Sequence, residues 1–83
     1  GAHFGQRFGA TPNLPAKRAG VRRVWLQAVS VGELLAVAPL LEAWRHEGGV
    51  EVYLTTTTST GYALAEGRYL RSGRVMGLGY FPL

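Results

Sequence analysis

The most constraining feature of this sequence is a change in hydrophobic spacing that occurs twice along the chain. Residues 24–29 (VWLQAV) form a β-rich, mostly apolar run, which is typical of a strand buried on both faces. In residues 34–44 the apolar side chains instead recur at three- and four-residue steps, which predicts a helix. Glycine tolerates the left-handed cap conformation, so Gly48–Gly49 is predicted to end that helix. Pro39 lacks a backbone donor, and we therefore expect a kink or a restart over Leu35–Pro39.

The same alternation is repeated in the second half of the chain. A strand, a loop, a shorter helix and a third strand are predicted, over residues 50–54, 55–61, 62–70 and 75–81 respectively. Thr60 is the expected N-cap of the shorter helix, and Ser72–Gly73 is its expected end. Strand, helix, strand, helix, strand is the order of a parallel sheet with right-handed crossovers. The fold class is therefore α/β, corresponding to the first half of a Rossmann-like, doubly wound domain.

Length and composition exclude several classes of site. The 83 residues suffice for one small domain at most, with residues 1–23 predicted to be an irregular basic arm and 24–83 the partial domain. The chain has no cysteine, which excludes disulfides, thiolate metal sites and a cysteine nucleophile. It has no aspartate, and its two histidines, His3 and His46, are far apart, which argues against a histidine metal cluster and a Ser-His-Asp triad. The longest apolar run, Leu34–Leu41, is too short to span a membrane.

Charge is unevenly distributed along the chain. Residues 1–32 carry five cations and no acid, whereas residues 33–83 carry four arginines and five glutamates. A basic front end predicts an anionic partner, such as a lipid head group, nucleic acid or an anionic substrate. The alternative is a solvated arm without a partner. Because the arm has no aromatic ladder and no RNA-binding or zinc-finger signature, nucleic acid is the weakest of these options.

Ser30-Val31-Gly32-Glu33 follows the first predicted strand, at the edge where open α/β sheets bind ligands. Gly32 would let a ligand approach the backbone, and the Glu33 carboxylate could take a proton from an attacking hydroxyl. The same spacing is also a capping box, in which Ser30 and Glu33 satisfy backbone donors and have no catalytic role. The local pattern does not decide between these interpretations.

Five threonines and a serine follow the second predicted strand, in residues 55–60, before Gly61. Such a loop can hydrogen-bond phosphate or sugar oxygens. Alternatively, the first two threonines finish the strand and Ser59 or Thr60 caps the helix. Neither a phosphate-binding loop nor the dinucleotide fingerprint is present. Trp25 and Trp44 are expected in the core.

Taken together, these segments resemble the start of the 3-deoxy-D-manno-octulosonic acid (Kdo) transferases of lipopolysaccharide assembly. The order and gaps of five segments fit over nearly the whole chain, and the two central ones are fairly specific in combination. The matching segments are Arg7-Phe8-Gly9, residues 24–33 (VWLQAVSVGE), Pro39-Leu40-Leu41, residues 55–61 (TTTTSTG) and residues 80–83 (YFPL).

The resemblance implies a GT-B glycosyltransferase with two Rossmann-like domains, of which this chain covers the first half of the acceptor-side domain. Such enzymes move Kdo from CMP-Kdo to a lipid A precursor, invert the anomeric centre and need no metal or other cofactor. The resemblance implies that Glu33 is the general base and that Ser30 and Gly32 shape the acceptor cleft. Thr58, Thr60 and Gly61 match the family's motif over residues 55–61.

The resemblance also implies a cellular location, and the sequence departs from the family pattern at two positions. The family works at the cytoplasmic face of the bacterial inner membrane, so the basic arm would face anionic lipid, peripherally or beside an anchoring segment that this sequence does not include. Gln27 stands where histidine is usual, and Ser59 where proline is usual. Because the donor domain is not among these residues, the chain alone is not expected to be active. The alternative function is a non-enzymatic basic module that binds anions or a membrane surface.

Overall fold

A computed structural model describes residues 20–81 of the chain. The predictions for residues 1–19 and 82–83, including the Arg-Phe-Gly motif and most of the basic arm, lie outside the described residues. The elements are, in order, β1 (Arg22–Ala28), α1 (Val31–Ala36), α2 (Ala38–Glu47), β2 (Val50–Thr56), α3 (Ser59–Ala65), the π-helical turn η1 (Glu66–Leu70) and β3 (Gly77–Tyr80).

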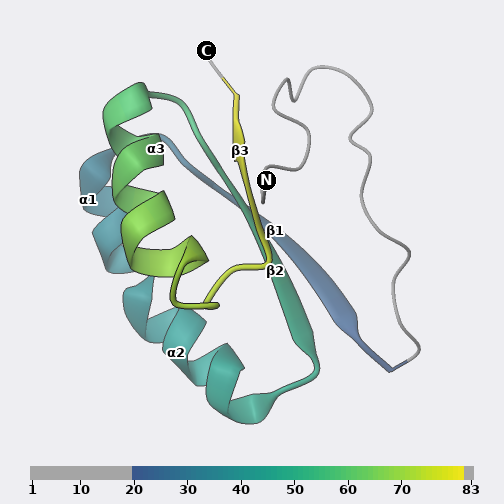
Figure 1. Cartoon of the computed structure of the whole chain (residues 1–83). Helices are drawn as coiled ribbons and strands as arrows, with labels where there is room; N and C mark the ends of the chain where they lie inside the picture. The colour runs from purple at the N-terminus through teal and green to yellow at the C-terminus, as the bar shows by residue number, and fades with distance from the viewer. Residues whose placement is uncertain (1–19, 82–83) are drawn as a thin grey trace.

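The three strands form one parallel sheet in the order β1-β2-β3. Leu26 pairs with Leu54, which in turn pairs with Leu78, so these side chains share one face of the sheet. All the helices lie on that face (Figure 1). The predicted α/β class with parallel strands is confirmed.

The core lies between the helices and this face of the sheet. The largest apolar side chains that are fully buried are Leu34 of α1, Leu41 of α2, Leu54 of β2 and Leu78 of β3. Fully burying one such side chain contributes roughly 1.5–3 kcal/mol. Because each of four elements supplies one of these leucines, the core fixes the helices over the sheet.

The long helix predicted over residues 34–44 is interrupted, as expected. α1 ends at Ala36, Val37 lies between the helices, and α2 starts at Ala38 with Pro39 in its first turn. The missing N–H of a proline costs nothing there, because the first-turn amides of a helix have no partner within it. Gly48 then caps α2 with a φ of 77°, which confirms the predicted end.

Four local predictions are wrong. The structure starts α3 at Ser59 rather than Tyr62, and Thr58 rather than Ser59 or Thr60 is its N-cap, since its extended backbone turns its hydroxyl toward the Gly61 N–H. β1 is not buried on both faces. Trp25, which was expected in the core, is 54% exposed, because β1 lies at the edge of the described sheet and Trp25 lies on the face without helices. β2, which lies between the other two strands, is buried on both faces along most of its length.

Candidate active site

The two predicted site segments lie at the same edge of the sheet. β1 ends at Ala28 and β2 ends at Thr56, and these two residues are paired in the parallel register. Both strands run to the upper edge in Figure 1, where α1 and α3 begin. The segments that follow, residues 29–33 and 57–61, are therefore neighbours, as the alternation predicted.

Ser30 and Glu33 form a closed turn at the start of α1. The Glu33 N–H donates to the Ser30 hydroxyl over 3.1 Å. The Val29 N–H donates to Glu33 Oε1 over 2.8 Å. A standard capping box would use the N–H of Ser30 itself, so this is a variant shifted by one residue. The capping interpretation is confirmed.

Glu33 keeps one oxygen open. The residue is exposed, and among the described residues no group donates to Oε2. The cap therefore holds the carboxylate in place through Oε1 and leaves Oε2 available to an external proton donor. Capping and catalysis, which the sequence presented as alternatives, are compatible in this geometry.

Gly32 lies in the first turn of α1 and is exposed. A Cβ at this position would meet only Ser30 Oγ, at 3.8 Å. Its φ is not in the left-handed region, so the backbone conformation does not require glycine there. The space over the Gly32 backbone is open, beside the Glu33 carboxylate.

The second segment, residues 57–61, contains the N-cap and the first residues of α3. The Gly61 N–H donates to Thr58 Oγ1 over 3.0 Å, which caps α3. Gly61 is buried, and a Cβ there would lie 3.1 Å from both Leu34 Cδ1 and Thr58 Oγ1. Gly61 therefore lets α3 pack closely against α1, whereas Thr60 is exposed at the same edge.

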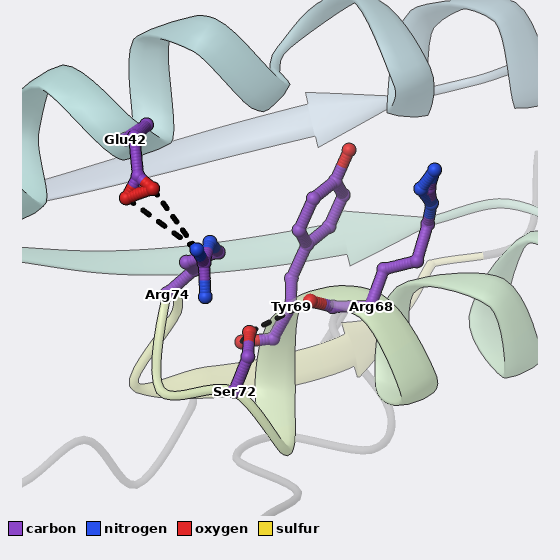
Figure 2. A network of polar contacts seen from close by, with 5 residues as sticks. All are labelled: Glu42, Arg68, Tyr69, Ser72 and Arg74. Carbon is purple, nitrogen blue, oxygen red and sulfur yellow. Dashed lines mark hydrogen bonds and ion pairs between the residues drawn. The ribbon is translucent and has the colours of Figure 1, made fainter.

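Two further residues connect the site to its surroundings: Thr57, from the predicted threonine-rich loop, and Tyr69, which the sequence did not single out. Thr57 Oγ1 donates to the Val29 carbonyl over 3.3 Å. The buried Tyr69 hydroxyl donates to the Leu34 carbonyl, one residue after Glu33. Figure 2 shows the Tyr69 ring extending away from η1, near the Arg74–Glu42 ion pair that joins the segment before β3 to α2 at 2.9 Å. These partners are remote in sequence, so no local motif identifies them.

The face of the sheet without helices carries polar contacts. Arg23 forms an ion pair with the buried Glu51 at 3.3 Å and lies 5.1 Å from the centre of the Tyr53 ring. Trp25 Nε1 donates to Thr55 Oγ1 over 2.9 Å. Arg23 is thus bound into the sheet, while the neighbouring Arg22 is exposed. Of the five cations of the basic front end, only these two lie within the described residues.

Residues 20–81 contain no group of three or more histidine, aspartate or glutamate side chains placed to hold a metal ion. No helix within the same residues is both long enough and apolar enough to cross a bilayer. Gln27 is exposed near the end of β1.

Comparison with known proteins gives one result. A family model described as 3-Deoxy-D-manno-octulosonic-acid transferase (kdotransferase) matches residues 2–83. No curated protein and no solved structure gives a significant match. The chain therefore belongs to the Kdo transferase family, as its N-terminal part, and this membership implies that the full-length protein is a glycosyltransferase of lipopolysaccharide synthesis.

Proposed function

We propose that the full-length protein transfers Kdo from CMP-Kdo to a lipid A precursor, with inversion at the anomeric carbon and Glu33 as the general base. The described sheet would then belong to the acceptor-side domain of a GT-B enzyme, and a second Rossmann-like domain would bind the donor. Family membership supports a sugar-nucleotide donor and a lipid A acceptor in general.

The geometry of Glu33 carries this proposal. Oε1 is anchored on the Val29 N–H, and Oε2 is open at the edge of the sheet where ligands of this fold class bind. In the proposed step Oε2 accepts the proton of the acceptor hydroxyl while that oxygen bonds to the anomeric carbon. The bond from this carbon to the CMP phosphate oxygen breaks on the opposite face, and CMP leaves with the electron pair.

The remaining predicted residues surround this carboxylate in different ways. We propose that the acceptor passes over the open backbone of Gly32 and beside Ser30, whose hydroxyl already caps α1. Thr60 is exposed and available to the acceptor. Thr58 and Gly61 would act indirectly, because the Thr58 cap and the close packing at Gly61 hold α3 in place.

Replacement of Glu33 by glutamine tests the base. Glu33→Gln keeps an amide oxygen that can accept the Val29 N–H, so the cap and the fold are preserved while the basic oxygen is lost. General bases typically contribute 10²–10⁴-fold, so kcat is expected to fall at least about 100-fold. Glu47→Gln is the matched control, since Glu47 is exposed at the end of α2, away from the site.

The outcome separates the two interpretations of the Ser30–Glu33 turn. Loss of turnover in Glu33→Gln with an unchanged unfolding transition supports catalysis. Near-normal turnover in Glu33→Gln would reduce Glu33 to a helix cap and remove the proposed mechanism.

A second function, binding to an anionic membrane surface, is supported by the exposed apolar side chains next to the site. Val29, Val31, Leu35 and Leu40 are each at least 40% exposed, on or beside α1 and the start of α2. Together with the basic front end, they support a peripheral position on an anionic membrane surface, which we propose to be the cytoplasmic face of the inner membrane. Flotation with anionic and with zwitterionic vesicles, at low and high salt, tests this; binding that ignores both lipid charge and salt would contradict it.

A further inference from the structure

The backbone of Val29 is hydrogen-bonded to two side chains, one from α1 and one from the segment after β2. Its N–H donates to Glu33 Oε1 over 2.8 Å, and its carbonyl accepts from Thr57 Oγ1 over 3.3 Å. Val29 follows the last residue of β1, its side chain is 45% exposed, and the register of β1 with β2 ends one residue before it. The register of the sheet ends before Val29, so these two side-chain contacts help to hold its backbone.

The other end of the same turn is held separately. Leu34 is buried in the core, and its carbonyl accepts the hydroxyl of the buried Tyr69. Glu33 therefore has a fixed residue on its C-terminal side and an exposed one, Val29, at the other end of its turn. Because Oε1 accepts from the Val29 N–H, the position of the Val29 peptide helps to set where the Glu33 carboxylate lies.

We infer that Thr57 is a positioning residue for Glu33, an inference that rests on the proposed role of Glu33 as the base. Thr57 belongs to the segment after β2 and reaches the segment after β1, so its hydroxyl ties the two halves of the site together. Threonine suits this task because its β-branched side chain is stiff at χ1 and aims the hydroxyl in one direction. Thr57 acts on the reaction through the Val29 peptide and does not touch the acceptor.

A matched set of variants of the full-length protein tests this role. Thr57→Val keeps the shape and removes the hydroxyl, whereas Thr57→Ser keeps the hydroxyl. We expect kcat to fall about tenfold in Thr57→Val, while KM stays within twofold of the unchanged protein. This loss of kcat is larger than that expected for a typical single hydrogen bond and smaller than the ~10²-fold loss that a 1 Å misplacement causes. Thr57→Ser restores most of the activity. Ser59→Ala, in the same segment and exposed, retains full activity.

The double variant separates positioning from a purely structural role. If Thr57 acts through the Glu33 carboxylate, Thr57→Val has little further effect on kcat when Glu33 is already glutamine. An equal tenfold loss in both backgrounds overturns the inference, as does a normal kcat or a raised KM at normal kcat in Thr57→Val. Thr57→Ala provides the same test if the valine variant does not fold. Normal turnover in Glu33→Gln alone is a different result, which overturns the proposed base itself.

Discussion

Replacement of Tyr69 by phenylalanine tests whether one hydroxyl, remote in sequence, holds the helix that carries Glu33. α1 spans six residues, so the Leu34 carbonyl is among the four at its C-terminal end that lack a partner within the helix. The Tyr69 hydroxyl from η1 donates to this carbonyl, and both residues are buried. Phenylalanine preserves the ring and removes only the donor.

The expected loss follows from the burial of the acceptor. A buried carbonyl left without a donor costs about 1–3 kcal/mol. With the urea m-value of about 2 kcal/mol/M that is typical of one small domain, the unfolding midpoint of the domain that carries α1 should fall by roughly 0.5–1.5 M. Urea unfolding of the full-length protein, followed by tryptophan fluorescence and circular dichroism, measures this shift.

The control is a second tyrosine without such a bond. Tyr80 of β3 is half-buried, and its hydroxyl forms no hydrogen bond with any residue in the range 20–81. Tyr80→Phe should therefore change the unfolding free energy by less than about 0.5 kcal/mol. Equal midpoints for the two variants would refute the role assigned to the Tyr69 hydroxyl.

Two further predictions concern the glycines of the site and the alkaline limit of stability. Gly61→Ala should lower the unfolding free energy by about 1 kcal/mol, because its Cβ would meet Leu34 Cδ1 at 3.1 Å, whereas Gly32→Ala should be neutral or stabilising by up to about 1 kcal/mol. Equal unfolding midpoints for the pair would contradict this, and a raised acceptor KM in stable Gly32→Ala would support the proposed cleft. Burial, with a smaller effect of Glu66, raises the pKa of Tyr62 to about 12, so its contribution to stability is complete below pH 10 and lost as the pH rises toward 12. Absorbance titration should show a step near pH 12 that is missing from Tyr62→Phe. If the titration of this variant is unchanged, the step belongs to another tyrosine.

Spacing along the chain predicted the elements well, because the signals that specify them are local. The break near Pro39, the end of α2 at Gly48 and the strand–helix alternation depend on residues a few positions apart. The Ser30–Glu33 cap is local too, and the sequence identified it correctly, although the shift of the carboxylate to the Val29 N–H was not foreseen. The start of α3 was missed because several consecutive hydroxyl residues were all chemically able to cap it.

Burial of the strands was not predictable in the same way. The apolar run of β1 indicated a central strand, yet β1 lies at the edge of the described sheet and exposes Trp25. β2, which carries Glu51 and Thr55, has a neighbour on each side and is buried along most of its length. A charged residue is tolerated there because Arg23 pairs with it across the sheet. The two edge strands differ as well, since β1 is exposed or half-buried along most of its length and Gly77–Gly79 of β3 is buried, so burial depends on the whole fold and not on the composition of one strand.

The sequence by itself determined the α/β class, the parallel sheet, the family and the turn that carries Glu33, because each depends on residue spacing or on motifs within one segment. The tertiary structure alone decided that Oε1 of Glu33 is anchored while Oε2 is open, and that Thr57 and Tyr69 hold the two ends of its turn. The partners in these two contacts are 28 and 35 residues apart. The first pair meets because parallel strands bring their carboxyl ends to one edge, and the second because α1 and η1 lie on the same face of the sheet, so no local pattern in the sequence encodes either.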